Sequence, residues 1–394
     1  MGISLGLVGL GSFGSAFARL FKSHPLVDRI GLCDLEPDRM AKFAEDPFFA
    51  DKFSPADAYG SLEEICESDL DALVIITQHW LHTPQAVQAM EAGKHVYSAV
   101  PLLCVPDGDE ILQWCDKLVE TVKRTGLHYM YGETTYYRPQ AMYCRRRAAE
   151  GAFGEFVHTE GDYLHDVEHG LRGVKTSRLG STAGTEYARK MAEYKARGVQ
   201  TGPMHYPTHS TAGPICVTGA HMTRVCAWGY RNRTGDPYFH EDVADPAGQF
   251  SNETALFTMS NGATCQIREY REIGHGGFEG FRIYGTEGSF EANTWHPRKG
   301  PREAVTVEQM RDPLPAEVLE GFQAGGDDKS VYGGHGGSHA YLVHEFVDAI
   351  AHDRTPAITA WDAVRYTAAG AMAHKSALAD GEVMNVPDWG DPPR

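Results

Sequence analysis

The 394-residue sequence lacks the features of a membrane or exported protein. It has no run of about 18 apolar residues, which excludes a conventional transmembrane helix and makes a membrane partner unexpected. The first segment, MGISLGLVGLGSFG, has neither a basic start nor a small-residue cleavage site. We therefore expect it to form a first strand and not a signal peptide.

Paired cysteines and positive charge are also scarce. The eight cysteines are scattered without a Cys-x-x-Cys pair, which predicts free thiols and a location in the reducing cytoplasm. Lys and Arg total 36 against 53 Asp and Glu, a formal net charge of −17 that repels phosphate backbones. The one basic cluster, Arg145 to Arg147, is too short for a basic stripe, so we expect no nucleic-acid partner.

The length favours two domains, and the first shows alternating strand and helix patterns. The expected strands are Ile3–Val8, Arg29–Cys33, Ala72–Ile76, His95–Ser98 and His128–Tyr131, with helices at Thr83–Glu91 and Asp107–Thr125. This alternation predicts a Rossmann-type, doubly wound parallel sheet in residues 1–131. Residues 132–394 then form a second α/β domain, with the C-terminal helices packing back towards the first.

A glycine-rich turn follows the first strand and reads Gly9-Leu10-Gly11-Ser12-Phe13-Gly14. Gly9 permits the tight turn, Gly11 lets a pyrophosphate approach the backbone, and Gly14 lets helix and strand pack closely. The second strand ends in Asp34, which can accept hydrogen bonds from ribose hydroxyls and would repel a 2′-phosphate. The motif predicts that the cofactor is NAD and not NADP.

Two further segments follow strands at the edge of the sheet where ligands bind. They are Thr77-Gln78-His79-Trp80-Leu81-His82 and Ala99-Val100-Pro101. We expect cofactor contacts from Thr77, His79, Trp80, His82 and Pro101. The alternative for Trp80 is simple packing.

The second domain reads mainly as strands. These are Glu155–Gly161, Thr254–Met259, Ala263–Tyr270, Gly280–Tyr284 and Gly288–Glu291, followed by helices at Ser338–His352 and Ala360–Ala379. Asn261-Gly262 favours a hairpin, because both residues tolerate positive φ. A glycine loop around His335, residues 333–337, could reach the site.

A polar, glycine-rich segment lies between Glu168 and Met204, with a short helical pattern at residues 187–196. A segment of this length predicts a functional loop or lid. Arg172, Lys175 and Arg178 are basic there, in an otherwise acidic protein. They form either a solvated loop or a pocket for an anionic sugar substituent such as a carboxylate or sulfonate.

Several of these segments make the chain resemble the Gfo/Idh/MocA superfamily of sugar dehydrogenases. The resemblance rests on GLGSFG, on HTPQAVQAMEAGKHV near residue 90, on GAFGEFVHTEGDY near residue 155 and on GHGGSH near residue 335. It implies a Rossmann domain joined to an α/β domain with an open, mainly antiparallel sheet. That sheet commonly mediates oligomers, so we expect a homo-oligomer, either a dimer or a tetramer.

The chain departs from this family in the segment Ala99-Val100-Pro101. After the GKHV strand the family usually has Glu-Lys-Pro, whose lysine helps to deprotonate the reacting hydroxyl, but here Val100 replaces it. Valine cannot carry a proton. The NAD-dependent glycosidases of the superfamily also tend to lack this lysine. The chain resembles them in Glu133 of MYGETTYY, in Tyr163-Leu164-His165-Asp166 and in Tyr206-Pro207-Thr208-His209.

This resemblance implies a redox cycle on a glycoside. Hydride leaves C3 of a pyranose for NAD, a base removes the acidified C2 proton, the aglycone leaves C1, water adds, and hydride returns to C3. The resemblance gives Tyr163 the role of the C2 base, with His165 as electrostatic help. His209, supported by Tyr206, would act at the C3 hydroxyl. Glu133 would bind a sugar hydroxyl or relay protons.

Alternatives remain for the function and for the histidines. The chain could be an ordinary sugar or polyol dehydrogenase, or a non-catalytic NAD-binding regulator. The substrate could be an anionic sugar such as a sulfoquinovoside. His158, His165 and His169 could converge on a metal, but no compact ligand motif is present, so we expect none.

Overall fold

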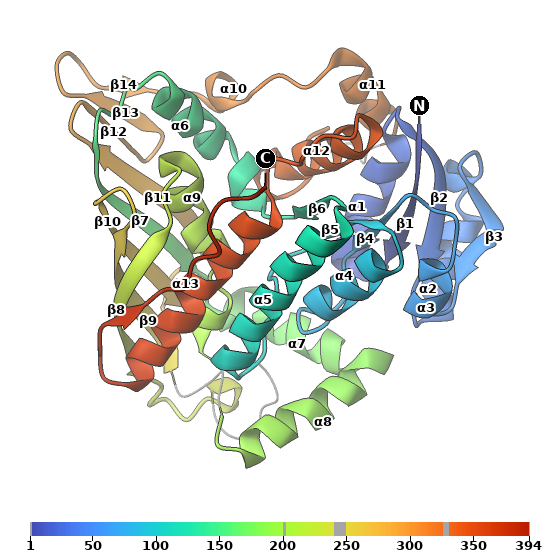
Figure 1. The fold of residues 1–394 in the computed structure, drawn as a ribbon, viewed down its shortest axis with the longest axis horizontal. Helices are drawn as coiled ribbons and strands as arrows, with labels where there is room; N and C mark the ends of the chain where they lie inside the picture. Colours follow the sequence, from blue (N-terminus) through green and yellow to red (C-terminus); the bar gives the residue numbers. More distant parts are fainter. Residues whose placement is uncertain (1, 200–201, 240–249, 326–330, 394) are drawn as a thin grey trace.

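The computed structural model describes residues 2–199, 202–239, 250–325 and 331–393, which form two sheets with helices around them (Figure 1). The first sheet has the order β3-β2-β1-β4-β5-β6, and all its neighbouring strands are parallel. Its strands are β1 (Ile3–Val8), β2 (Val27–Cys33), β3 (Phe53–Tyr59), β4 (Ala72–Ile75), β5 (His95–Ser98) and β6 (Tyr129–Tyr131). The predicted Rossmann sheet is confirmed. Apolar patterning missed β3 because most of its residues are polar or exposed.

Helices connect these strands on both faces of the sheet. They are α1 (Ser12–Ser23), α2 (Pro37–Glu45), α3 (Leu62–Cys66), α4 (His82–Glu91) and α5 (Gly108–Thr125). Asp107 caps α5 by accepting hydrogen bonds from two backbone N–H groups, and Gly126 ends it in the left-handed conformation. None of the helices in the described ranges is both long and apolar enough to cross a bilayer.

The second sheet has nine strands in the order β14-β13-β12-β11-β7-β10-β9-β8-β15. They are β7 (Phe156–Leu164), β8 (Met222–Arg231), β9 (Phe250–Met259), β10 (Thr264–Tyr270), β11 (Phe278–Gly285), β12 (Gly288–Glu291), β13 (Thr294–Pro297), β14 (Glu303–Ala304) and β15 (Met384–Asn385). Only β7 and β10 are parallel neighbours, so the expected mainly antiparallel sheet is confirmed. Asn261 and Gly262 form the predicted turn between β9 and β10, with Gly262 at φ 87°.

Helices cover one face of this sheet and reach back to the first domain (Figure 1). They are α6 (Pro139–Ala149), α9 (Thr208–Thr218), α10 (Val307–Met310), α11 (Ala316–Gly325), α12 (Ser338–Ala351) and α13 (Ala360–Leu378). α13 packs on both β8 and α5, and α12 packs on α1. α9 packs on β7 at Gly161, where an added Cβ would lie 1.9 Å from the backbone oxygen of Ser210. Gly161 therefore sets the position of α9.

The segment predicted as a loop or lid is mostly helical. It forms α7 (Arg172–Leu179) and α8 (Thr182–Ala196), and residues 200–201 lie outside the described ranges. Tyr187 of α8 packs its ring against His79 and Trp80, and Gln78 donates a hydrogen bond to Ser181 at 2.8 Å. The prediction of a long loop was wrong because α7 buries no side chain, so its helical period carries no apolar signal.

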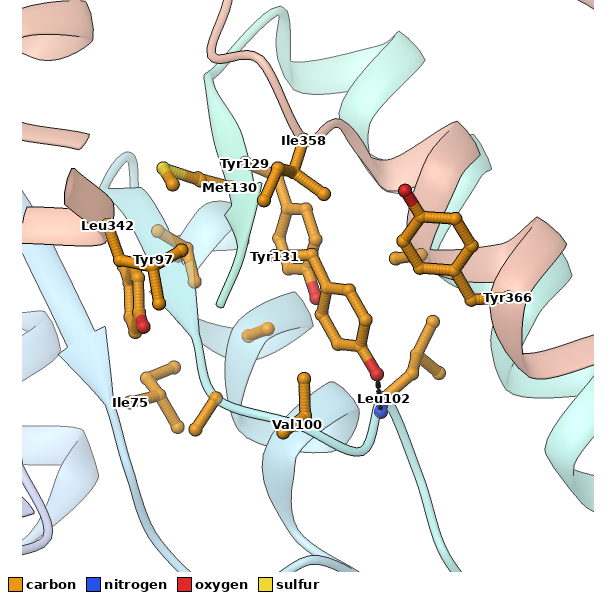
Figure 2. Close-up of a cluster of buried hydrophobic side chains, with 14 of the residues drawn as sticks. Ile75, Tyr97, Val100, Leu102, Tyr129, Met130, Tyr131, Leu342, Ile358 and Tyr366 are labelled. Atoms are coloured by element: carbon orange, nitrogen blue, oxygen red, sulfur yellow. Dashed lines mark hydrogen bonds between the residues drawn. The ribbon is translucent and has the colours of Figure 1, made fainter. Parts of the chain in front are cut away.

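An apolar cluster fixes the segment after β5 against the C-terminal helices (Figure 2). The Tyr131 hydroxyl accepts a hydrogen bond of 2.7 Å from the Leu102 backbone N–H, and the Tyr131 N–H donates to the Ile358 oxygen at 2.9 Å. Val100, at the position of the missing lysine, is buried in this cluster. The valine therefore belongs to a packed core.

The glycine-rich turn has the geometry that the sequence predicts. Gly9 has φ 92°, and a Cβ there would lie 2.3 Å from the Ile76 oxygen. A Cβ on Gly14 would lie 2.0 Å from the Gly9 oxygen, so helix and turn can approach only with glycine at both positions. A Cβ on Gly11 would have one neighbour, an Arg39 nitrogen at 4.0 Å. The backbone at Gly11 is thus open to a pyrophosphate at the start of α1.

Asp34 lies beside this turn at the end of β2. Its two carboxylate oxygens accept hydrogen bonds from the backbone N–H groups of Leu10 (2.7 Å) and Glu36 (2.8 Å). Arg39 Nη1 also donates to both oxygens at 3.4 Å, a neighbour that the sequence motif does not include. A ribose hydroxyl that binds Asp34 would take the place of these long hydrogen bonds.

Replacing Asp34 by alanine should weaken NAD binding and relax discrimination against NADP. The substitution removes the ribose acceptor and its repulsion of a 2′-phosphate, while the positive charge of Arg39 remains. Calorimetric titration with both nucleotides measures the ratio of their Kd values. The double variant Asp34→Ala/Arg39→Ala is the control. It should lose the increase in NADP affinity that Asp34→Ala is expected to show. Retention of the wild-type preference in Asp34→Ala would show that Asp34 does not select the nucleotide.

Candidate active site

The segments after β4 and β5 are tied together by His82. Its Nδ1 lies 2.8 Å from the Pro101 oxygen and its Nε2 lies 3.2 Å from the Thr77 oxygen. Burial lowers the pKa of His82 to about 4, so the ring is neutral and donates one of these two hydrogen bonds. His82 therefore braces the cofactor edge of the sheet through the backbone of Thr77 and Pro101.

Trp80 and His79 are buried against α8. The Trp80 ring lies 6.0 Å from Tyr187, and its Nε1 donates to Gln78 at 3.0 Å. This is the packing that the simpler alternative for Trp80 predicts. Direct cofactor contacts by Thr77, His79 and Trp80 stay predictions.

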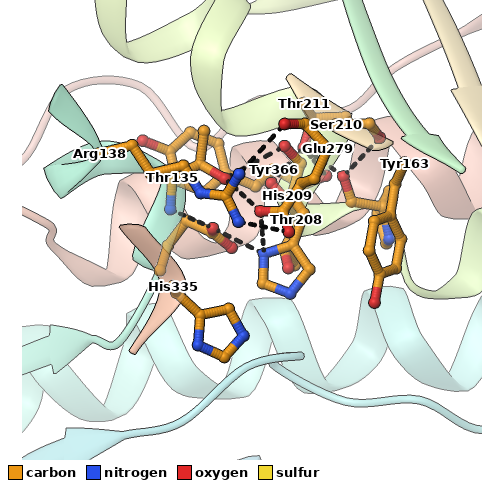
Figure 3. A network of polar contacts seen from close by, with 12 residues as sticks. Thr135, Arg138, Tyr163, Thr208, His209, Ser210, Thr211, Glu279, His335 and Tyr366 are labelled. Carbon is orange, nitrogen blue, oxygen red and sulfur yellow. Dashed lines mark hydrogen bonds and ion pairs between the residues drawn. The ribbon is translucent and has the colours of Figure 1, made fainter. Parts of the chain in front are cut away.

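A buried cluster of charged groups lies where the two domains meet (Figure 3). His209, on the first turn of α9, directs Nδ1 to Glu133 Oε1 at 2.9 Å and to Glu279 Oε1 at 3.6 Å. Glu133 follows β6, and Glu279 is on β11. Arg138 lies 2.5 Å from the second oxygen of Glu279. The cluster thus joins two carboxylates, one imidazole and one guanidinium.

The carboxylates decide the charge of His209. Burial opposes its protonation, but Glu133 and Glu279 outweigh burial and raise the pKa of His209 to about 9. Burial also opposes ionisation of Glu133, yet the adjacent His209 lowers the pKa of that carboxyl to about 2. At neutral pH the pair is an imidazolium and a carboxylate. We expected His209 to accept a proton. Because its pKa is raised, His209 is protonated at neutral pH and must lose that proton before it can accept another.

Glu133 is fully buried behind His209. Its Oε1 accepts hydrogen bonds from the Thr135 backbone N–H (2.8 Å) and from His209. The two roles predicted for Glu133, binding of a sugar hydroxyl and relay of protons, both stay predictions.

Tyr163 and His165 form a second pair at the end of β7. The Tyr163 hydroxyl lies 2.6 Å from His165 Nδ1, and His165 Nε2 lies 3.0 Å from the His169 carbonyl oxygen. A carbonyl can only accept, so Nε2 carries the proton and Nδ1 accepts the phenolic hydrogen. Burial raises the pKa of Tyr163, and the Arg271 guanidinium, 4.6 Å from the ring centroid, acts in the opposite direction.

The structure brings the five predicted catalytic residues together. The Tyr163 ring centroid lies 5.1 Å from that of His209 and 6.2 Å from that of Tyr206, which in turn lies 5.6 Å from His209. In Figure 3 the Tyr163 hydroxyl and the free edge of His209 point to the same side. The contacts of Tyr163 with Tyr206 and His209 join residues more than forty positions apart in the sequence.

The three basic residues of this segment have different neighbours. Arg172 is held by Glu168 at 2.7 Å and by a short contact with Asp236, and Lys175 lies 4.7 Å from the ring of Tyr238. Burial lowers the pKa of His79, and the positive charge of Arg178 lowers it further. Burial raises the pKa of Tyr206, and the charge of Arg178 acts in the opposite direction. A role for Arg172, Lys175 or Arg178 in binding an anionic sugar substituent stays a prediction.

Sequence reasoning missed several residues of the site. They are Thr135, Arg138, Glu269, Arg271 and Glu279. No local motif marks them, since each gains its position from strand pairing or from a turn. The register of β7 with β11 pairs Tyr163 with Glu279, and its register with β10 pairs Tyr163 with Glu269.

Glu133, His209 and Glu279 also form a group whose ligand atoms lie within 4.8 Å of one another. Arg138 and the proton on His209 already supply positive charge to these carboxylates. The three histidines considered from sequence do not converge in the described part of the chain, because His158 contacts Thr264 while His165 contacts Tyr163. The expectation of no metal stays a prediction.

Two family models match the chain. The model described as "Oxidoreductase family, NAD-binding Rossmann fold" matches residues 3–133. The model described as "Oxidoreductase family, C-terminal alpha/beta domain" matches residues 203–385. Both belong to the Gfo/Idh/MocA family, and together they cover most of the sequence.

Curated relatives carry glycosidase names. A "Glycosyl hydrolase family 109 protein" of Stenotrophomonas maltophilia is 24% identical over 98% of this chain and 89% of its own length. An "Alpha-N-acetylgalactosaminidase" of Bacteroides fragilis is 31% identical, over 54% of this chain and 47% of its own length. A protein of the same name from Tannerella forsythia is 26% identical over 82% of this chain and 71% of its own length.

Several solved structures with this fold are dehydrogenases. Levoglucosan dehydrogenase in complex with NADH and levoglucosan superposes with a TM-score of 0.73 at 19% identity, over 98% of this chain and 100% of that chain. The scyllo-inositol dehydrogenase of Lactobacillus casei with NAD(H) and scyllo-inositol gives 0.66 at 17% identity, over 98% and 99%. With both family models matched, this chain belongs to the Gfo/Idh/MocA oxidoreductase family and has its NAD-binding Rossmann domain.

Proposed function

We propose that this chain is an NAD-dependent glycoside hydrolase that acts by transient oxidation at C3, elimination, addition of water and re-reduction. The observation that carries the proposal is the pairing of Tyr163 with His165 beside His209, at a site where Val100 replaces the family lysine. The glycosidase names of the relatives support it. When bound, NAD accepts hydride from C3 and returns it, so no cofactor is consumed.

His209 accepts the proton of the C3 hydroxyl in this proposal. Its Nδ1 is held by Glu133, which leaves Nε2 for the substrate (Figure 3). Because the pKa of His209 is raised to about 9, the ring must first lose its own proton. Oxidation at C3 then breaks the C3–H bond, and the hydroxyl proton moves to Nε2.

Tyr163 removes the C2 proton in the next step. The phenolic hydrogen moves to His165 Nδ1, and the oxygen takes the proton from C2, whose bonding electrons form a C1–C2 double bond as the bond between C1 and the aglycone oxygen breaks. The aglycone oxygen keeps the electrons of the broken bond and takes a proton from water. The Arg271 guanidinium against the ring stabilises the negative oxygen during this transfer. Water then adds at C1, a proton returns to C2 and hydride returns to C3.

An NAD-dependent sugar or polyol dehydrogenase is the second candidate. It shares the C3 step, and the dehydrogenases of the same fold favour it. It would stop at the ketone and release NADH, and it would give the Tyr163–His165 pair no proton to remove. A non-catalytic regulator would bind NAD and do neither.

The open face of the second sheet fits the proposed homo-oligomer. Trp228, Tyr230, Leu256 and Phe278 lie on β8, β9 and β11 and expose between 42 and 51% of their surface. Their neighbours along the strands, such as Ala227, point to the helices instead. A second copy of the chain that covered these residues would bury apolar surface.

Tyr163→Phe tests the elimination step. The substitution keeps the ring and removes the hydroxyl, so NAD reduction should persist while aglycone release falls about 10²–10⁴-fold, as for loss of a general base. Wild-type enzyme in deuterium oxide should place deuterium at C2 of the released sugar. Tyr284→Phe, on the opposite face of the sheet, is the matched control. Unchanged release from Tyr163→Phe, or no deuterium at C2, argues against elimination.

The raised pKa of His209 predicts the pH dependence of C3 oxidation. Only neutral His209 accepts a proton, so the single-turnover rate of NAD reduction should rise with pH until about pH 9. Glu279→Gln removes one carboxylate that raises this pKa and leaves the Arg138 charge unbalanced, which should move the rise to lower pH. Glu303→Gln, on the exposed strand β14, should not move it. If the pH dependence of NAD reduction is the same in Glu279→Gln as in the wild type, His209 is not the base.

Arg178 is one of the three candidates for binding an anionic substituent, such as the sulfonate of a sulfoquinovoside. If it binds the anion, Arg178→Met should raise KM at least tenfold for charged glycosides and leave neutral ones unchanged. Arg172→Met is the control, because Arg172 is held by Glu168 and Asp236. Equal losses on charged and neutral glycosides would indicate a packing role for Arg178.

A further inference from the structure

His335 lies between the nucleotide turn and the catalytic cluster. Its ring centroid is 5.7 Å from that of Phe13 in the glycine-rich turn and 6.4 Å from that of His209. The residue has φ 50°, and the neighbouring glycines 333, 336 and 337 also have positive φ. A non-glycine residue in this conformation is uncommon and fixes the direction of its side chain. The loop therefore holds one imidazole against the site.

Hydrogen bonds determine which nitrogen of His335 carries its proton. The Gly334 backbone N–H donates to His339 Nδ1 at 3.2 Å, so Nδ1 of His339 has no hydrogen. Burial lowers the pKa of His339 to about 3, and the neutral ring must carry its proton on Nε2. That nitrogen lies 2.9 Å from His335 Nδ1 and donates to it. His335 is thus left with Nε2–H as a donor.

The charges around His335 keep it neutral. Burial lowers its pKa, and the positive charge of His209 lowers it further. Glu279 and Glu133 act in the opposite direction, and Arg138 acts with His209. On its other side His335 meets Phe13 and the neutral His339. Its Nε2–H is a neutral hydrogen-bond donor, and no hydrogen bond from it is seen within the described ranges.

Three functional groups follow one another across the site. His209 lies between His335 and Tyr163, and the Nε2 edge of His335, the free edge of His209 and the Tyr163 hydroxyl face the same space (Figure 3). In the proposed function, Tyr163 acts at C2 and His209 at the C3 hydroxyl. The next carbon of a pyranose in this direction is C4.

We propose that His335 binds the hydroxyl on C4 of the sugar through Nε2–H and makes its configuration a determinant of specificity. This inference rests on the proposed function for the order of Tyr163 and His209 along the ring. An equatorial and an axial hydroxyl at C4 point in different directions, and a fixed donor with a fixed tautomer can reach only one of them well. A hydroxyl accepts this hydrogen bond, whereas an ammonium group cannot.

The test combines substrates that are altered at C4 with a variant that is altered at His335. Two aryl glycosides that differ only at C4, and the matching 4-deoxy compound, are compared with wild-type enzyme and with His335→Leu. Wild-type kcat/KM should fall about tenfold or more when the preferred 4-hydroxyl is removed or inverted. His335→Leu should treat the three compounds alike within about twofold, because the interaction is already lost. His352→Leu, at the exposed end of α12, should behave as wild type.

Two readouts keep this test separate from the glycosidase proposal. The test is measured on aglycone release and, with the corresponding free sugars, on NADH formation. If wild-type enzyme forms NADH but releases no aglycone, the glycosidase proposal fails. The effect of the C4 hydroxyl on wild-type enzyme and on His335→Leu can then still be measured by NADH formation. Equal loss from His335→Leu on hydroxy and deoxy compounds would overturn the role of His335.

A measurement on the wild-type protein covers the case in which His335→Leu does not fold or bind NAD. A 4-amino-4-deoxy glycoside, charged at neutral pH, offers only donors at C4. Wild-type enzyme should reject it more strongly than the 4-deoxy compound, and His335→Gln, which keeps an N–H donor, should retain that order. Acceptance of the ammonium compound as readily as the 4-deoxy compound would contradict a donor at C4.

Discussion

The buried ion pair between Glu133 and His209 is the interaction on which the site depends. It joins the end of the Rossmann sheet, where Glu133 follows β6, to the first turn of α9 in the second domain. A buried charge without its partner is strongly destabilising, so the two domains must meet at this point for either residue to be stable. Within the second domain Gly161 sets the position of α9, which carries His209, because it lets α9 lie directly on β7.

This pair also explains how the site manages without a lysine. Val100 is part of an apolar cluster with Tyr131 and Leu102 and offers no proton, whereas His209 carries one at neutral pH (Figure 2). In the proposed function, the positive charge beside the reacting hydroxyl therefore lies on the second domain instead of the first. Two carboxylates, Glu133 and Glu279, control it there, and the Tyr163 ring centroid lies 5.1 Å from that of His209.

Features formed by residues close together in the sequence could be predicted. Contacts that depend on strand pairing or on packing between distant segments could not. The first two Rossmann strands, the glycine-rich turn and Asp34 follow one another within 34 residues and could be identified in order. Glu279 could not, because it reaches Tyr163 only through the register of β7 with β11. The contact of Arg172 with Asp236, 64 residues away, could not be predicted for the same reason. The polar helix α7 has no apolar period to reveal it.

The central claim is that one hydride leaves C3 and returns to it while a glycosidic bond is broken. An aryl glycoside with deuterium at C3, turned over by enzyme with bound NAD, tests this claim. The account predicts that aglycone is released without net NADH, that the released sugar keeps deuterium at C3, and that release is slower than with the unlabelled compound if oxidation limits the rate. Deuterated NADH accumulating in proportion to a 3-keto product, with the glycosidic bond intact, would contradict the account and identify a dehydrogenase.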